Sequence, residues 1–301
     1  MRIVEVCCVL IFLICATNCV VVLDKVEGNW DLPLTPDIRD ANVANSTIPF
    51  QAWIKLRTKE ARNEQNLQEI VRNNQDFEFN FMDDESMDAF MDKNFKNTST
   101  LWAYKSVNPV LIAAKVDIWR IAALWLYGGV YIDDDSALSG KLHDIIEKND
   151  QFIFGVEKNK YGGCYDPSYP LNSTGKALQT SSDGQMIVNW FLLSRPRHPF
   201  LENNLKNIVQ VFKDIKNGKA VINKGWFLPK VICATGPGIL SASVDQVISR
   251  DGNIKFRNAG VDFSKYGAKW MSNNYRKKGN NPRHYSNLEK NGAGLVLKSD
   301  I

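Results

Sequence analysis

The sequence has little excess charge of either sign. Its 37 Lys and Arg residues are nearly balanced by 33 Asp and Glu residues, which leaves a formal net charge of +4. A surplus this small does not predict binding to nucleic acid, although it is compatible with an anionic substrate such as a nucleotide. Hydrophobic residues make up 44% of the 301-residue chain and charged residues 23%. These proportions are ordinary for a globular protein that is long enough to bury a large core.

Cysteine is scarce outside the N-terminal segment. Only Cys164 and Cys233 lie beyond residue 23, and the remaining four are Cys7, Cys8, Cys15 and Cys19. In an oxidising compartment the two body cysteines form one disulfide, and in a reducing one they are buried free thiols. The sequence leaves both alternatives open.

The N-terminal segment is almost entirely apolar. Residues 3–23 are interrupted only by Glu5, Thr17 and Asn18, and about 20 apolar residues are needed to cross a bilayer as a helix. We predict that residues 1–24 form a signal anchor, with a cleaved signal peptide as the alternative. Residues 25–46, which are rich in Asp, Asn and Pro, are predicted to form a stem, and residues 47–301 one folded domain.

The folded domain shows strand patterns that alternate with helical patterns. Such alternation predicts an α/β fold with a largely parallel sheet, in which ligands bind at the carboxyl ends of the strands. Strands are predicted at 48–54, 77–81, 130–132 and 152–156, and helices at 58–73, 83–94, 109–127 and 199–215.

The stretch from Lys115 to Asp135 carries most of the functional information. Its helix begins near Pro109 and ends at Gly128 and Gly129, as expected for residues that adopt left-handed conformations. A short apolar strand follows and ends in three consecutive aspartates.

The aspartates suggest a metal site. Asp133 and Asp135 at the end of a buried strand offer two carboxylates to a hard cation such as Mn²⁺ or Mg²⁺, which prefers oxygen ligands. An acidic turn without a ligand is the alternative for this triplet. One helix earlier, Asp117 and Arg120 share a helix face that is otherwise apolar, so both charges require partners.

This stretch resembles the signature of the DXD-containing glycosyltransferases of the sugar-binding-region family. In that family a helix reading A-x-x-S-D-x-x-R-x-x-x-L-x-x-x-G-G leads into Y-x-D-x-D. Weaker similarities flank it and extend the resemblance over about residues 48 to 240. The residues that carry it here are Ala113, Asp117, Arg120, Leu124, Gly128, Gly129, Tyr131, Asp133 and Asp135, with Phe50–Trp53, Ser194–Pro199 and Thr235–Gly238 as flanking motifs.

The resemblance implies a fold and an activity. Family members adopt the GT-A fold, a Rossmann-like sheet flanked by helices, and transfer a sugar from a nucleotide sugar with Mn²⁺ or Mg²⁺ and with retention of configuration. The expected donor is GDP-mannose, with a UDP-sugar as the alternative, and the expected acceptor is a glycan or glycolipid. Combined with the signal anchor, it implies a single-pass type II protein of the Golgi or endomembrane system with a lumenal catalytic domain.

The resemblance also assigns residue roles. It makes Asp117, Arg120, Asp133 and Asp135 the catalytic residues. Asp135 is expected to bind the metal, Asp133 the metal or the ribose, and the helical pair the sugar hydroxyls. His284 or Trp270 is expected to complete the metal or diphosphate site. Further donor contacts are implied for Trp53, Asn189, Thr235 and Gly236, although a core role for Trp53 is an equal alternative.

Two positions depart from the family pattern, because Phe50 replaces the usual His and Val116 the usual Ser. Two other functions remain open. One is a phosphotransferase of the haloacid-dehalogenase type, which also carries Asp-x-Asp at a strand end. The other is a sugar-binding protein of the same fold without turnover.

Overall fold

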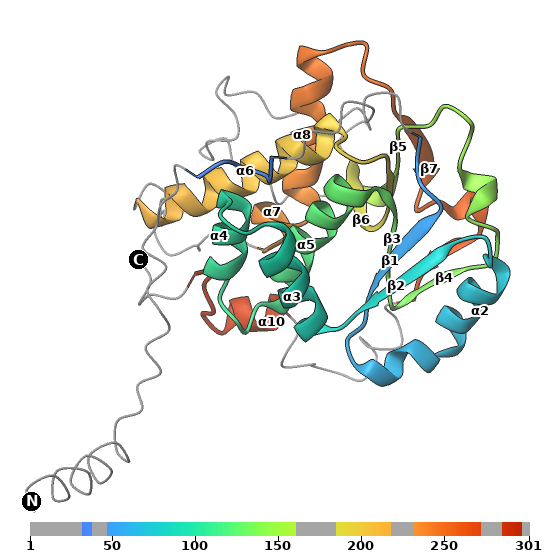
Figure 1. Cartoon of the computed structure of the whole chain (residues 1–301), viewed down its shortest axis with the longest axis horizontal. Helices are drawn as coiled ribbons and strands as arrows, with labels where there is room; N and C mark the ends of the chain where they lie inside the picture. The colour runs from blue at the N-terminus through green and yellow to red at the C-terminus, as the bar shows by residue number, and fades with distance from the viewer. Residues whose placement is uncertain (1–31, 38–46, 161–184, 218–230, 272–284, 297–301) are drawn as a thin grey trace, which may run out of the picture.

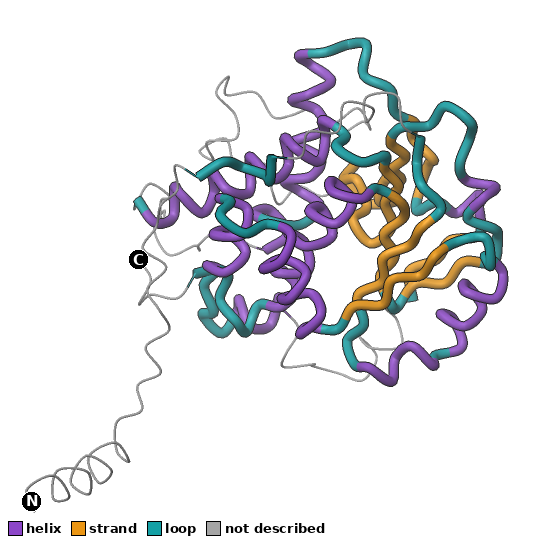
Figure 2. Tube along the Cα trace, viewed as in Figure 1, coloured by secondary structure: helices purple, strands orange, loops and turns teal. Residues whose placement is uncertain are grey.

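The computed structural model describes residues 32–37, 47–160, 185–217, 231–271 and 285–296. The predicted anchor, most of the predicted stem and His284 lie outside these residues. The described part is a sheet with helices on both sides (Figures 1 and 2).

The sheet has six strands in the order β2-β1-β3-β6-β5-β7. Their pairings make β6 antiparallel to both its neighbours, whereas the other five strands run in one direction. The prediction of a largely parallel sheet is therefore confirmed, with β6 as the exception. The strands are β1 (Gln51–Lys55), β2 (Glu78–Met82), β3 (Gly129–Asp133), β5 (Phe152–Lys160), β6 (Gln185–Ser194) and β7 (Arg257–Val261).

Alternating strand residues separate the core into two layers. Trp53 and Tyr131 pack on one face of the sheet, and Ala52 and Val130 pack on the other, as the two-residue period of a strand requires. The first face is covered by α3 (Asp84–Asn94), α4 (Ser99–Ser106), α5 (Ile112–Tyr127), α6 (Pro199–Lys216), α7 (Val231–Ala234) and α8 (Pro237–Arg250). The second is covered by α2 (Gln65–Asn73) and a two-stranded sheet of β4 (Ser136–Leu138) and β8 (Ala268–Trp270).

Helix α5 delivers the chain to the central strand β3. It is buried along most of its length, and the two residues that follow it, Gly128 and Gly129, have φ values of +66° and +98°. A Cβ at Gly128 would lie 2.8 Å from the carbonyl oxygen of Ser194. The predicted glycine stop is confirmed, because both the conformation and the space exclude a side chain.

Several predicted boundaries differ from the observed ones. The helix predicted over 58–73 is divided at Glu64 into a 3-10 helix, Lys59–Asn63, and α2. The predicted helix at 109–127 begins three residues later, at Ile112. The short helix α4 was not predicted. The remaining elements are the 3-10 helices His143–Ile145 and Ser264–Tyr266 and helix α10 (Tyr285–Lys290).

One described segment, Val231–Arg250, is long and apolar enough to pass a test for membrane spans, and 72% of it is buried inside the protein. Asn203 of α6 donates a hydrogen bond of 2.9 Å to the carbonyl of Ser243 in this segment. The segment thus packs as a core helix pair.

Cys233, within this segment, is disulfide-bonded, which excludes the free-thiol alternative for that residue. Cys164 lies outside the described residues.

Candidate active site

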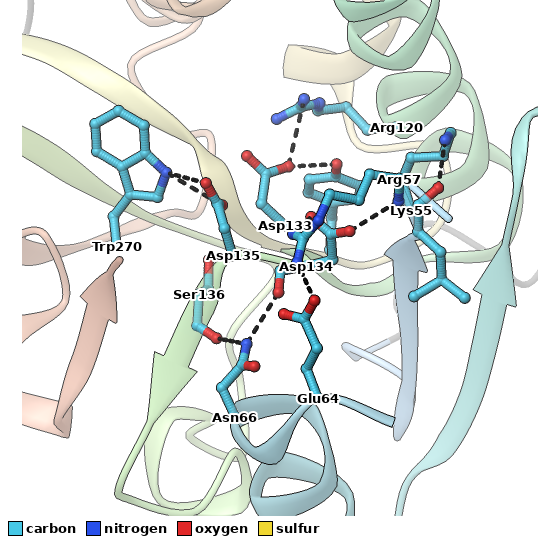
Figure 3. A network of polar contacts seen from close by, with 12 residues as sticks. Lys55, Arg57, Glu64, Asn66, Arg120, Asp133, Asp134, Asp135, Ser136 and Trp270 are labelled. Atoms are coloured by element: carbon cyan, nitrogen blue, oxygen red, sulfur yellow. Dashed lines mark hydrogen bonds and ion pairs between the residues drawn. The ribbon is translucent and has the colours of Figure 1, made fainter. Parts of the chain in front are cut away.

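The three aspartates form a turn between β3 and β4, at the carboxyl end of the central strand. The side-chain amide of Asn66, on α2, holds this turn by donating to the carbonyls of Asp134 (2.9 Å) and Ser136 (2.7 Å). Figure 3 shows the surrounding network. The edge of the sheet at which ligands were expected is therefore where the acidic turn lies.

Asp133 is held from two sides by residues of the preceding elements. The Tyr131 hydroxyl donates to its Oδ1 over 2.5 Å, and Arg120 Nη2 lies 3.5 Å from the same oxygen. The Arg120 guanidinium also stacks 4.4 Å from the centre of the Tyr131 ring. These contacts place a buried positive charge directly behind the first DXD carboxylate.

Asp117 and Arg120 form a buried ion pair within α5. Asp117 Oδ1 lies 3.2 Å from Arg120 Nη2, and both side chains are 7% exposed. The carboxylate of Asp117 also accepts from Asn189 Nδ2 (2.9 Å) and from Thr235 Oγ1 (3.0 Å). Arg120 donates in turn to the carbonyl of Asn189. Asp117 thus has a partner on each oxygen.

Gly236 follows Thr235 and lies against the same carboxylate. A Cβ at Gly236 would be 3.3 Å from Asp117 Oδ2. The structure therefore brings together Asp117, Arg120, Asn189, Thr235 and Gly236, which the sequence had placed at one site.

Asp135 lies on the other, more open side of the turn. The indole N–H of Trp270 donates to its two carboxylate oxygens over 3.2 and 3.1 Å. Pairing of β4 with β8 sets Trp270 opposite Ser136, and the backbone N–H of Met271 donates to the carbonyl of Asp135. Trp270 is 41% exposed, so it is a surface residue of the site and not a core tryptophan.

The middle aspartate has separate partners. Asp134 accepts from the backbone N–H of Arg57 (2.8 Å) and lies 3.2 Å from Arg57 Nη1. Arg57 is also paired with Glu64 at the start of α2. Asp134 thus fixes the turn to β1 and α2, which leaves Asp133 and Asp135 between Arg120 and Trp270 (Figure 3).

Burial and repulsion from neighbouring carboxylates raise the pKa values of Asp135 and Asp117. Burial, followed by the charges of Asp133 and Asp134, raises the pKa of Asp135 to about 7. Burial also raises the pKa of Asp117 to about 6, although Arg120 and the hydrogen bond from Thr235 oppose the shift. The negative charge near Asp135 is thus only partly balanced by the protein.

This imbalance bears on the metal site. Two partly exposed carboxylates, of which Asp135 is incompletely neutralised, suit a hard divalent cation, which takes oxygen ligands from protein, substrate and water. Within the described residues, no three His, Cys, Asp or Glu side chains converge in a metal-binding arrangement. Asp133 and Asp135 are the described carboxylates that would hold such a cation, and His284 lies outside the described residues.

Trp53 lies away from the acidic turn. It is 5% exposed, donates its indole N–H to the carbonyl of Gly128 (2.9 Å) and stacks on Tyr127. The structure thus places it in the core, the second of its two predicted roles. Sequence reasoning missed Arg57 and Asn66, which hold the turn from distant segments, and it quoted Tyr131 only as part of the motif.

Comparison with known proteins shows which family this region is similar to. Residues 60–152 match the family described as "Glycosyltransferase sugar-binding region containing DXD motif", which confirms the resemblance inferred from the sequence over that range. The chain is also 26% identical over 102 residues to the O-glycosyltransferase braB of Annulohypoxylon truncatum. That match covers 34% of this chain and 20% of the fungal protein, so the chain spans about a fifth of its relative's length.

Solved structures with some likeness are also glycosyltransferases. The PaToxG glycosyltransferase has a TM-score of 0.44 and 13% identity, with 84% of this chain and 83% of the other covered. The UDP-bound glycosyltransferase domain of the YGT toxin has a TM-score of 0.34 and 14% identity, with 59% and 52% covered.

Proposed function

Because residues 60–152 match the family of glycosyltransferases with a DXD-containing sugar-binding region, we propose that the chain transfers a sugar from a nucleotide sugar to a hydroxyl group. The observation that carries the proposal is the pairing of a buried Asp117–Arg120–Asp133 network with a half-exposed Asp135 at one strand end. We further propose that the domain has the GT-A fold.

Asp133 and Asp135 would hold Mn²⁺ or Mg²⁺. The cation, when bound, neutralises negative charge that develops on the diphosphate leaving group. Arg120 fixes the orientation of Asp133 through the ion pair and the stack on Tyr131. Trp270 fixes Asp135 from the other side. The protein thus preorganises both carboxylates, so that little reorganisation accompanies binding.

The donor sugar would bind beside Asp117 and Arg120. The Nε atom of Arg120 is buried and has no hydrogen-bond partner among the described residues. An unpaired buried donor costs about 1–3 kcal/mol, so a ligand oxygen that accepts from Nε would be favoured. Asn189 and Thr235 keep the Asp117 carboxylate in place, and thereby the guanidinium that pairs with it.

We propose that transfer retains the configuration at the anomeric carbon and takes place on one face of the sugar. The acceptor oxygen forms a bond to the anomeric carbon while the bond to the diphosphate breaks, and a phosphate oxygen takes the hydroxyl proton. Mannose from GDP-mannose is the preferred donor sugar, with UDP-sugars as the alternative, and a glycan or glycolipid is the acceptor.

A lumenal location is part of the proposal. The apolar run at residues 3–23 would anchor the chain. The disulfide at Cys233 supports an oxidising compartment such as the secretory pathway, because cytosolic proteins rarely keep disulfides.

The test is hydrolysis of a panel of GDP- and UDP-sugars by the purified full chain with Mn²⁺, with Asp135→Ala and the surface variant Lys93→Gln as a matched pair. We expect metal-dependent release of nucleotide with one donor, lost in Asp135→Ala and kept in Lys93→Gln. Phosphate release from simple phosphate esters without any nucleotide sugar would favour the phosphotransferase alternative. Donor binding without release would favour the sugar-binding protein without turnover.

A further inference from the structure

A polar groove lies between the flank of α2 and the end of edge strand β2. It has a volume of about 300 Å³. Its lining consists of two arginines, three amide side chains and two apolar side chains, with no acidic residue: Arg62, Arg72, Asn63, Gln68, Gln75, Val71 and Phe81. A groove with this lining carries positive charge that the lining itself does not neutralise.

The two arginines of the groove have no carboxylate partner among the described residues. The guanidinium of Arg62 stacks 4.7 Å from the centre of the Phe81 ring. Neither Arg62 nor Arg72 forms an ion pair with any residue that the structure describes. A guanidinium fixed on an aromatic ring and lacking a carboxylate partner is well suited to bind a phosphate oxygen.

The remaining lining indicates a sugar. Asn63, Gln68 and Gln75 each offer an amide donor and acceptor, which match hydroxyl groups. Only Val71 and Phe81 are apolar, too little surface to receive an acyl chain. The volume is at the lower end of the range for small-molecule sites, which is appropriate for one sugar unit with its phosphate.

The groove is close to the proposed transfer site. Phe81 pairs with Ile54, which pairs with Ile132, the residue before Asp133. Neighbouring strands are about 4.8 Å apart, so Phe81 and Ile132 are about 10 Å apart across two strands. Helix α2 also forms one wall of the groove and carries Asn66, which holds the acidic turn.

We propose that this groove binds a phosphorylated sugar unit of the acceptor, with the phosphate on Arg62 and Arg72. The proposal rests on the proposed glycosyltransferase function and names its acceptor class. The acceptor hydroxyl would then reach the transfer site from a sugar neighbouring the one in the groove.

The experiment compares binding of mannose 6-phosphate and mannose to the full chain by calorimetry, without metal or nucleotide sugar. We expect the wild type to bind the phosphorylated sugar at least about 10-fold more tightly, because two charge-assisted contacts are gained. The double variant Arg62→Gln/Arg72→Gln should lose this preference, and Arg62→Lys/Arg72→Lys should keep part of it. The control Lys93→Gln/Lys96→Gln removes the same charge at the end of α3 and should keep the whole preference.

Equal affinity for the two sugars in the wild type would overturn the proposal. An equal loss of the preference for the phosphorylated sugar in Arg62→Gln/Arg72→Gln and in Lys93→Gln/Lys96→Gln would also overturn it. Binding only to phosphatidylcholine vesicles that contain phosphatidylinositol, and not to mannose 6-phosphate, would also overturn it, because the occupant would be a lipid headgroup. Failure of the proposed function would give a different result. The wild-type protein would hydrolyse no nucleotide sugar, whether or not it prefers mannose 6-phosphate to mannose.

Discussion

The two working aspartates of the acidic turn have different surroundings. Asp133 faces a buried network in which Arg120, Asp117 and Tyr131 are all paired. Asp135 faces an exposed tryptophan, and repulsion from its neighbours raises its pKa to about 7. One side of the turn is balanced by the protein, and the other is left with excess negative charge.

The difference indicates a division of labour. The Asp133 side is part of the folded core, so its residues should contribute to stability as well as to activity. The excess negative charge around Asp135 is neutralised only when a cation binds, so residues on that side should affect activity with little effect on stability.

The largest effect is expected from Arg120→Met. The substitution leaves the carboxylates of Asp117 and Asp133 near each other without their buried cation, and breaking a buried pair from one side costs about 3–5 kcal/mol. Urea denaturation should show this loss in the free energy of unfolding. The double variant Asp117→Asn/Arg120→Met should recover part of it, and a single variant as stable as the wild type would disprove the structural role of the pair.

Asp135→Asn should have the opposite profile. Nucleotide-sugar hydrolysis should fall by about 100-fold or more, the scale for losing one preorganised electrostatic group. The free energy of unfolding should stay equal to the wild-type value or rise slightly, because a repelled charge is removed. A clear loss of stability would show that the two sides do not differ as described.

Trp270→Phe removes one hydrogen bond to Asp135 and keeps the ring. Loss of a group that orients a metal ligand typically costs 10–100-fold in metal affinity, and we expect about 10-fold in the Mn²⁺ concentration for half-maximal hydrolysis. Phe50→Leu, an exposed aromatic on the second face of the sheet, serves as the control. An unchanged Mn²⁺ requirement in Trp270→Phe would remove the indole from the site.

The smallest effect concerns pH and the buried carboxyl of Asp117. Its folded pKa of about 6 lies above the ordinary value of 3.8, so the folded protein binds the extra proton between these values and gains stability as pH falls. Relative to Asp117→Asn, the wild type should become more stable by about 1 kcal/mol between pH 7 and pH 5. Urea denaturation at both pH values measures this, and a constant or opposite difference would refute the shift.

Local patterns predicted the elements that carry the site. The glycine pair predicted the end of α5, and the spacing of Asp117 and Arg120 predicted that they share a helix face, where they form an ion pair. The direction of β6 could not be predicted, because an apolar run does not encode the direction of its neighbours. The antiparallel course of this strand is what brings Asn189 to the carboxylate of Asp117.

Long-range partners of the turn were harder to predict. Asn66 and Arg57 contact the turn from about 70 residues earlier, and Trp270 from 135 residues later. No periodic pattern links such segments, and only the β4–β8 pairing sets Trp270 beside Asp135. The family resemblance did propose Trp270, which physical reasoning from spacing alone would not have done.

The most direct test of the central claim is Mn²⁺ binding measured by electron paramagnetic resonance on the wild type, Asp135→Asn and Asp134→Asn. We expect one bound ion in the wild type and loss of that ion in Asp135→Asn. Binding should be retained in Asp134→Asn, because the Asp134 carboxylate is paired with Arg57. Equal binding by all three proteins, or loss in Asp134→Asn alone, would contradict it.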